Sequence, residues 1–355
     1  MKMSFRWFGG QDDSVTLAQI RQIPGMKGVV SSLYHVPVGE EWSKGEIQAL
    51  KAEVESAGLL LLGIESVNIH ENIKLGAPDR DKYIAAYRNT IRNLGECGVD
   101  LICYNFMPVL DWLRTDLAAL LPDGSRAMAY DDSLVKNIAP EDMVKSLDSQ
   151  AGGFMLPGWE PERLAETSRL VARYKGVTEA DLLANMGYFI NAVIPECEKY
   201  NVKLAVHPDD PPWSIFGLPR IVRDRGTLKR ILALSDSPMH GLTLCTGSLG
   251  SNPDNDLPAL IREFGGRINF VHMRNLKFGK PGCFSESAHL SEEGSLDMFA
   301  IAKALTDVGF DGVVRPDHGR MIWGEQARAG YGLYDRALGA CYIAGLFEAI
   351  IKMRG

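Results

Sequence analysis

Short apolar runs alternate along the chain with longer stretches in which apolar residues recur at helical spacing. Several of these runs are unbroken and rich in Val, Ile and Leu, which is typical of strands buried on both faces of a parallel sheet. Eight is the number of parallel strands that closes an α/β barrel. The pattern predicts eight strands, at Ser4–Phe8, Gly28–Leu33, Leu59–Glu65, Leu101–Phe106, Val202–His207, Leu242–Cys245, Ile268–His272 and Gly312–Asp317.

The segments between the runs predict helices. One begins with the capping-box sequence Ser43–Glu46 and ends before Gly58. Three others are predicted at 79–98, 178–200 and 295–309, and Pro195 is expected to kink or shorten the second of them. Strands that alternate with helices up to eight strands predict an α/β fold, the (β/α)8 TIM barrel.

One connection is too long for a single crossover helix. About 95 residues separate the fourth predicted strand from the fifth. We therefore expect an insertion of helices and loops after strand 4, at about residues 110–178, that covers the barrel mouth. Because the sequence shows no internal repeat and no low-complexity tract, residues 1–355 are expected to form one TIM-barrel domain.

Composition narrows the classes of partner and compartment. The chain is 46% hydrophobic and 23% charged, which is enough for a large core. A net charge of -7 argues against nucleic acid or an anionic membrane as the main partner. No apolar stretch reaches the length of a membrane helix, and the N-terminal apolar run breaks too early for a signal peptide. Six cysteines without a C-x-x-C pair favour a reducing compartment, so we expect a cytoplasmic protein.

Four consecutive predicted strands end on side chains that can bind a metal. In a TIM barrel the active site forms at the carboxyl ends of the strands, so these residues are expected to meet at the mouth. One such residue alone is more often structural, but four at equivalent positions are hard to explain by packing. Imidazole, thiolate and carboxylate together suit Zn²⁺ or Fe²⁺ as readily as Mn²⁺. The candidate metal ligands are His207, Cys245, His272 and Asp317.

Several sequence stretches resemble the mannonate dehydratase family. They are FRWFG, HPDDPPWSIFGLPRI, CTGSLG, VHMRN, RPDHGR and GYGLYDRALG, and the resemblance runs from residue 4 to residue 350. It implies a barrel of the xylose-isomerase-like group and a carbon-oxygen lyase (hydro-lyase) of hexuronate (glucuronate) breakdown. The implied reaction converts D-mannonate to 2-dehydro-3-deoxy-D-gluconate and water, with Mn²⁺ or Fe²⁺ held by the four candidate ligands. The family also implies a homodimer.

Dehydration of a sugar acid needs a base for the carbon-bound proton and an acid for the departing hydroxyl. A divalent ion would stabilise the enediolate-like charge that forms in between. His318 follows Asp317 at the mouth, and Tyr331 lies shortly after it in a Gly-rich loop. We assign His318 and Tyr331 as the acid/base pair without deciding which does which. Tyr334 is the rival for the tyrosine role.

Substrate contacts are assigned from positions near the strand ends. A planar guanidinium suits a carboxylate, amides and a phenol suit sugar hydroxyls, and an indole can pack on a sugar face. Arg274 and Arg320 are therefore the candidate partners of the carboxylate. The remaining candidate substrate-binding residues are Asn68, His70, Tyr104, Asn105 and Trp7.

Three other classes of function compete with the dehydratase. Metal-dependent sugar isomerases or epimerases of the same barrel group keep the hydroxyl, but they typically use acidic ligands, so Cys245 argues against them. Phosphodiester hydrolases with related ligands need a multi-metal cluster and a basic surface, which the net charge of -7 disfavours. A non-catalytic sugar-acid sensor would not require His318 or Tyr331.

Overall fold

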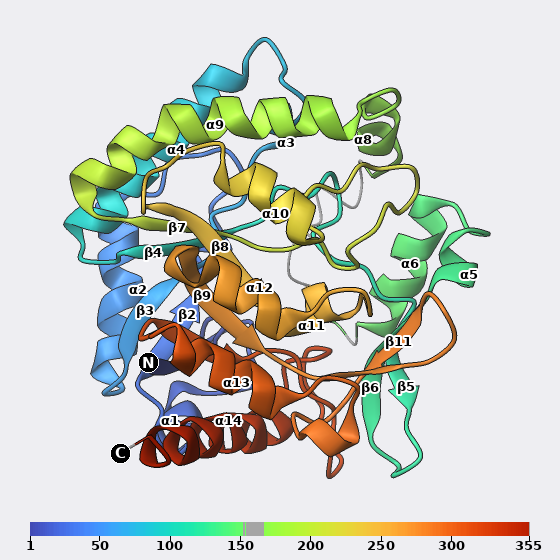
Figure 1. The fold of residues 1–355 in the computed structure, drawn as a ribbon. Helices are drawn as coiled ribbons and strands as arrows, with labels where there is room; N and C mark the ends of the chain where they lie inside the picture. The colour runs from blue at the N-terminus through green and yellow to red at the C-terminus, as the bar shows by residue number, and fades with distance from the viewer. Residues whose placement is uncertain (152, 154–166, 355) are drawn as a thin grey trace.

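Eight parallel strands form a closed barrel at the centre of the molecule (Figure 1). The structure, a computed structural model, describes residues 1–151, 153 and 167–354. The barrel order is β1-β2-β3-β4-β7-β8-β9-β12, and each strand lies within one or two residues of its predicted position. The predicted TIM barrel is confirmed. The strands are β1 Lys2–Arg6, β2 Gly28–Ser31, β3 Leu60–Glu65, β4 Leu101–Tyr104, β7 Lys203–Val206, β8 His240–Cys245, β9 Ile268–Met273 and β12 Val313–Pro316.

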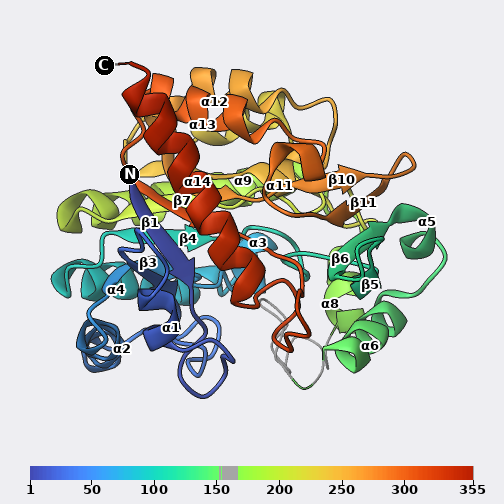
Figure 2. The ribbon, with the colours of Figure 1, turned by 90° about the horizontal axis from the view of Figure 1, so that it is seen from below.

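Helices surround the barrel (Figures 1 and 2). The predicted capping box is present at the start of α2, where the Ser43 side chain accepts from the Glu46 N–H. Around the barrel lie α1 Leu17–Arg21, α2 Lys44–Ser56, α3 Glu71–Lys74, α4 Arg80–Glu96, α8 Thr167–Arg173, α9 Glu179–Tyr200, α10 Arg225–Leu232, α11 Thr246–Gly250, α12 Leu257–Phe264, α13 Met298–Asp307 and α14 Tyr334–Lys352, with short 3₁₀ turns at Gly265–Arg267 and Ser291–Glu293.

Pro195 does not shorten its helix, so that half of the expectation is wrong. It lies inside α9, which continues to Tyr200. A proline leaves the carbonyl four residues earlier without its helical donor. That carbonyl belongs to Asn191, an exposed residue whose backbone water can reach. The missing hydrogen bond is therefore tolerated at this position.

Side chains alternate between the inside of the barrel and the layer under the helices. One hydrophobic cluster contains Cys103, Ala205, Phe270 and Val313, and fills the barrel interior. Their sequence neighbours belong to the larger cluster that packs against the helices; Ile102 is one of them. This alternation follows from the two-residue period of a strand. It decides which residues at the strand ends face the mouth.

A second, four-stranded sheet lies beside the barrel, on the side away from both termini (Figures 1 and 2). We call it the accessory sheet. Its order is β10-β11-β6-β5, with β5 Asp116–Leu120 and β6 Arg126–Asp131 between β4 and β7, and β10 Leu276–Phe278 and β11 Cys283–Glu286 after β9. The expected insertion of helices and loops at about 110–178 thus contains a β-hairpin as well as α5 Asp132–Val135, α6 Pro140–Gln150 and α8. Residues 152 and 154–166 of that expected segment lie outside the described residues.

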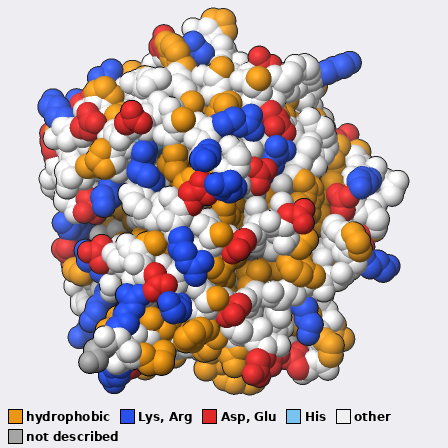
Figure 3. All heavy atoms as spheres, viewed as in Figure 1, with side chains coloured by type: hydrophobic (Ala, Val, Ile, Leu, Met, Phe, Trp, Pro, Cys, Tyr) orange, Lys and Arg blue, Asp and Glu red, His pale blue; other side chains and the backbone are white. Residues whose placement is uncertain are grey.

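The surface carries charges of both signs. On the face drawn in Figure 3, Lys and Arg side chains are interspersed with Asp and Glu side chains. This mixture agrees with the modest net charge of -7. Across the residues that the structure describes, no helix combines the length and the apolar character needed to cross a membrane.

His240 at the start of β8 predicts an acid-dependent loss of stability. Its ring is fully buried and Nε2 lies 2.8 Å from the Ile231 carbonyl oxygen. Burial lowers the pKa of His240 to about 4. In the unfolded chain His240 takes up a proton below about pH 6.5, whereas in the folded chain it stays neutral down to about pH 4. The free energy of unfolding therefore falls as the pH drops from 6.5 to 4. The loss amounts to about 3 kcal/mol.

A His240→Gln variant keeps a donor for the Ile231 carbonyl but does not titrate. Urea unfolding between pH 7 and 4 should therefore give a shallower acid slope than the parent chain. His35→Gln is the matched control, because the His35 side chain is 66% exposed. Equal slopes for the parent and His240→Gln would contradict the buried neutral histidine.

Candidate active site

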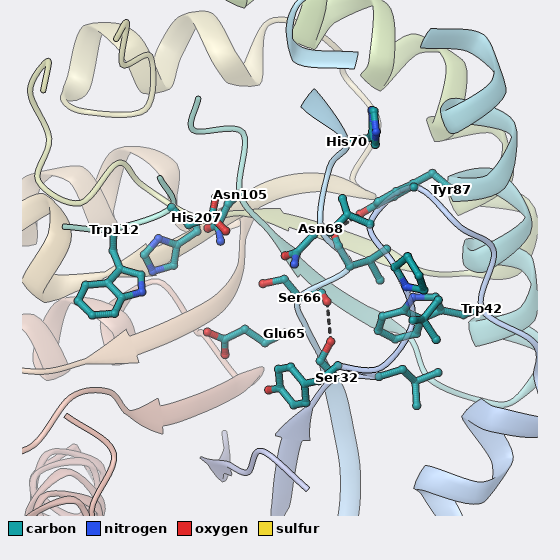
Figure 4. A pocket seen from close by; sticks show the side chains of 18 of the residues that line it. Ser32, Trp42, Glu65, Ser66, Asn68, His70, Tyr87, Asn105, Trp112 and His207 are labelled. Carbon is teal, nitrogen blue, oxygen red and sulfur yellow. Dashed lines mark hydrogen bonds between the residues drawn. The ribbon is translucent and has the colours of Figure 1, made fainter. Parts of the chain in front are cut away.

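A cavity opens at the carboxyl ends of the barrel strands, where the sequence places the metal-capable side chains (Figure 4). His207 and Trp112 lie on one side of it, and Trp42 and Tyr87 on the other, with Glu65, Ser66 and Asn68 between them. The Ser32 hydroxyl donates to the Ser66 carbonyl at 2.7 Å and ties the loops after β2 and β3 together. The cavity thus joins residues that follow most of the barrel strands.

Three of the four candidate ligands meet beside this cavity, which His207 lines. One ligand atom each from His207, Cys245 and His272 lie within 4.8 Å of one another. The fourth, Asp317, has Oδ2 at 3.4 Å from Cys245 Sγ. Each residue lies at or next to the end of its strand. His207, His272 and Asp317 share the parity of interior residues on their strands, and Cys245 alternates with the outer residue Leu244, so all four side chains turn inward. The structure thus brings the four candidate side chains close together, and their role as metal ligands stays a prediction.

The donor set fits a divalent metal. The Nδ1 of His207 bonds the Pro208 carbonyl oxygen at 2.7 Å, which leaves Nε2 for a ligand. Burial lowers the pKa of His207, so the imidazole is neutral, as a metal ligand must be. Among the described residues, the buried Nε2 of His272 makes no close hydrogen bond, and it lies 3.5 Å from Glu65 Oε2. The hydroxyl and N–H of Ser248 both donate to Cys245 Sγ, at 3.1 and 3.4 Å, and would also stabilise the negative charge of a metal-bound sulfur.

Asp317 is held by two buried arginines. Arg274 Nε lies 2.8 Å from Oδ2, and Arg315 Nη1 lies 2.7 Å from Oδ1. Burial alone would raise the pKa of Asp317, but His318, Arg315 and Arg274 hold it well below its usual range. The side chain is therefore a carboxylate, the form that ligates a metal.

A second group of metal-capable side chains, Glu65, Cys103 and His272, also lies within ligand distance. It is a poorer candidate. Glu65 is already paired with two arginines, at 2.6 Å from Arg6 and 2.7 Å from Arg315. Burial raises the pKa of the Cys103 thiol well above its ordinary value, and its Sγ lies 3.3 Å from the Thr243 hydroxyl. Because Asp317 is also paired with two arginines, the raised pKa of the Cys103 thiol is what makes this second group the poorer candidate.

His318 and Tyr331 form a hydrogen-bonded pair at the cavity wall. His318 Nε2 lies 3.1 Å from the Tyr331 hydroxyl, and their rings meet edge to face. Both side chains are buried and both line the cavity. Burial raises the pKa of Tyr331, so the phenol stays protonated near neutral pH. Tyr334, the rival, is 42% exposed and packs against Trp323, outside the cavity lining.

The predicted substrate contacts divide into two groups. Asn68, His70 and Asn105 line the cavity, although the His70 ring also stacks on Tyr83 and caps α3. The structure does not place the others on its wall. Trp7 and Tyr104 turn outward into the layer under the helices. Arg274 is fully buried among carboxylates, and Arg320 pairs with Asp123 and Asp335.

Sequence reasoning missed Arg6, Arg315 and Trp112, all of which line the cavity. The signal that could have found Arg6 and Arg315 is the alternation of side chains between the two faces of a strand. Met3, Phe5 and Trp7 belong to the outer cluster, so Arg6 between them faces inward. By the same alternation Asn105 faces the mouth and Tyr104 does not. Trp112 comes from the connection after β4, where no strand period exists to predict its direction.

Comparison with known proteins gives a consistent result. Residues 1–355 match the sequence profile of the family described as D-mannonate dehydratase (UxuA). The mannonate dehydratase of Thermotoga neapolitana is 57% identical over 356 residues, which cover 100% of this chain and 99% of that protein. The crystal structure of mannonate dehydratase from Streptococcus suis serotype 2 is 46% identical, with a TM-score of 0.90, and covers 100% of this chain and 96% of that one. A D-tagatose 3-epimerase-like protein shares only the fold, at 10% identity and a TM-score of 0.54.

Proposed function

Because the chain belongs to the D-mannonate dehydratase family and is therefore a hydro-lyase acting on D-mannonate, we propose that His207, Cys245, His272 and Asp317 hold its metal and that His318 and Tyr331 move its protons. The observation that carries this proposal is the meeting of a metal-capable cluster and a hydrogen-bonded His–Tyr pair at one cavity. The sugar isomerase alternative has no comparable support, because its barrel relative shares only the fold.

The metal is proposed to be Mn²⁺ or Fe²⁺. Two imidazoles, a thiolate and a carboxylate form a mixed donor set that suits borderline metals better than Mg²⁺ or Ca²⁺. When bound, such an ion supplies Lewis-acid stabilisation for negative charge on the substrate's carboxylate end. The protein residues fix the position of that charge relative to the proton-transfer pair.

The substrate's carboxylate end is proposed to lie between the metal ligands and the guanidinium groups of Arg6 and Arg315. Both arginines line the cavity and share Glu65, which fixes their planes by charge-assisted hydrogen bonds. They replace Arg274 and Arg320, which lie off the cavity wall. Asn68 and Asn105 are proposed to bond the sugar hydroxyls, with His70 farther out on the same wall.

The residues at the wall account for both proton transfers. Removing the proton from C2 leaves its electron pair to form the enediolate, and breaking the C3–O bond then needs a proton on the departing hydroxyl. His318 Nε2 is the base of the pair, since a neutral imidazole can take a proton there. The Tyr331 hydroxyl, kept protonated by burial, is the acid. The enol that results rearranges to the 2-oxo acid, so one D-mannonate gives one product and one water.

The proposed reaction is tested with the metal removed and returned. After dialysis against a chelator the protein should not turn over D-mannonate, and Mn²⁺ or Fe²⁺ should restore formation of the 2-oxo-3-deoxy acid. Proton NMR of the mixture separates dehydration, which converts C3 to a methylene, from epimerisation, which keeps its hydroxyl. A protein that binds one equivalent of metal and gives no 2-oxo acid would contradict the proposal.

The oligomeric state and the cellular compartment are two further proposals. We propose a homodimer, for which the exposed apolar side chains Trp323, Tyr334 and Leu338 offer a surface. A monomer in sedimentation velocity would rule it out.

We propose a reducing, cytoplasmic compartment, because oxidation of Cys245 would remove a candidate metal ligand. Fractionation that finds the protein outside the cytoplasm would contradict this.

A further inference from the structure

Glu286 places a buried carboxylate behind the His318–Tyr331 pair. It is the last residue of β11 and pairs with Leu276 across the hairpin of the accessory sheet. Its side chain is fully buried, and Oε1 lies 3.1 Å from His318 Nδ1. His318 and Tyr331, by contrast, follow β12, the last strand of the barrel. The Glu286 side chain therefore connects the accessory sheet to the proton-transfer pair.

The Glu286 carboxylate is ionised in this setting. Arg114 Nη2 lies 2.7 Å from Oε1, and Arg274 Nη1 contacts the same oxygen. Burial would raise the pKa of Glu286, but Arg274 and Arg114 hold it below its ordinary value. An ionised carboxylate can only accept hydrogen bonds. The contact with His318 therefore requires a hydrogen on Nδ1.

In the neutral ring that a general base needs, this geometry also determines the state of the other nitrogen. A neutral imidazole carries one N–H, so a hydrogen on Nδ1 leaves Nε2 with a lone pair. The Tyr331 hydroxyl, 3.1 Å away, then donates to Nε2. A directed chain of hydrogen bonds runs from Tyr331 through His318 to Glu286. The arrangement has the same logic as the carboxylate that orients histidine in a serine-hydrolase triad.

We propose that Glu286 is a positioning residue for the acid/base pair and holds His318 as the Nδ1–H tautomer with Nε2 ready to take a proton. The proposal rests on the proposed roles of His318 and Tyr331. The proton arrives from substrate carbon, whose electron pair stays behind on the substrate, and the ring becomes an imidazolium. The negative charge of Glu286 offsets that positive charge. When Nε2 releases the proton, the ring returns to the same tautomer.

A double-mutant cycle with His318 separates positioning from a merely structural role. Glu286→Gln should lower kcat on D-mannonate by about 10²-fold with bound metal and KM little changed, because the amide lacks the charge that steadies the imidazolium. In a His318→Asn background, Glu286→Gln should lower kcat by less than about twofold, because a residue that acts through His318 then has no histidine to position. An equal factor in both backgrounds would overturn the proposal.

Asp210 supplies the matched control. It pairs with Arg114 at 2.8 Å and with Arg274 at 2.7 Å, the same two arginines that hold Glu286. In the described part of the chain it forms no hydrogen bond or ion pair with His318. Asp210→Asn should therefore lower kcat by the same factor in the parent protein and in the His318→Asn background.

A second measurement does not depend on turnover. In protein labelled with ¹⁵N-histidine and loaded with diamagnetic Zn²⁺, the His318 resonance, identified by its absence in His318→Asn, should show the hydrogen on Nδ1. An Nε2–H tautomer in the parent protein would overturn the proposal even if Glu286→Gln fails to fold. The correct tautomer in a protein without activity on D-mannonate would instead leave the positioning intact and reject the proposed function.

Discussion

Replacing His318 by Asn, or Tyr331 by Phe, is expected to lower kcat on D-mannonate by about 10²–10⁴-fold, the usual contribution of a positioned acid or base. The two side chains contact each other at 3.1 Å and both line the cavity. Neither substitution alters a candidate metal ligand, so bound metal per chain should stay at the parent value. Because the pair acts as a unit, the double variant should be little worse than the poorer single variant.

Tyr334→Phe is the control for this experiment. Tyr334 is 42% exposed and packs on Trp323, so loss of its hydroxyl should change kcat by less than about twofold. Steady-state kinetics and metal analysis on the same preparations provide the measurements. Near-parent turnover in His318→Asn or Tyr331→Phe would remove that residue from the mechanism.

Replacing Cys245 by Ser should cost the protein its metal. A neutral hydroxyl is a far weaker metal ligand than a cysteine sulfur, which binds a metal as the thiolate. Changes to outer partners of a metal site cost 10–100-fold in affinity, so loss of a direct ligand should exceed about 100-fold. Turnover should fall in step with metal content and recover in part at high Mn²⁺. Metal content by atomic emission and a titration of activity against Mn²⁺ measure both.

Cys103→Ser is the matched control, because it tests the rival metal-capable group with the same chemical change. Cys103 is buried and lies beside Thr243 rather than at the mouth. This variant should keep its metal and its turnover at an unchanged metal requirement. If Cys103→Ser loses the metal while Cys245→Ser keeps it, the cluster of Glu65, Cys103 and His272 holds the ion instead.

The barrel and its candidate ligands were predictable because both depend on local pattern. Strands buried on both faces carry unbroken apolar runs, and residues at the ends of such strands must meet. The errors arose where direction mattered. Trp7 and Tyr104 were placed at the mouth from their position in sequence, whereas the two-residue period of the strands turns them outward and Arg6 and Asn105 inward. Counting in steps of two from the outward-facing apolar residues of each strand would have shown which residues at the strand end face the mouth.

Other features had no local signal. The accessory sheet pairs Tyr130 with Phe284, so no window of sequence contains both partners. Glu286 becomes visible only when this pairing carries it to His318. Its charge is stabilised by Arg114 and Arg274, which come from two further segments. Buried ion networks of this kind depend on the assembled fold, and composition cannot reveal them.

The accessory sheet also limits how this barrel can be re-engineered. Its hairpins leave the barrel after two different strands and are joined to each other by backbone hydrogen bonds between β6 and β11. Arg114 adds a second, ionic link to Glu286. Loop grafting usually treats each loop of a barrel as an independent module. Here the two hairpins would have to be transplanted together, because either one moved alone would leave an unpaired strand edge and break the buried ion pair of Arg114 with Glu286.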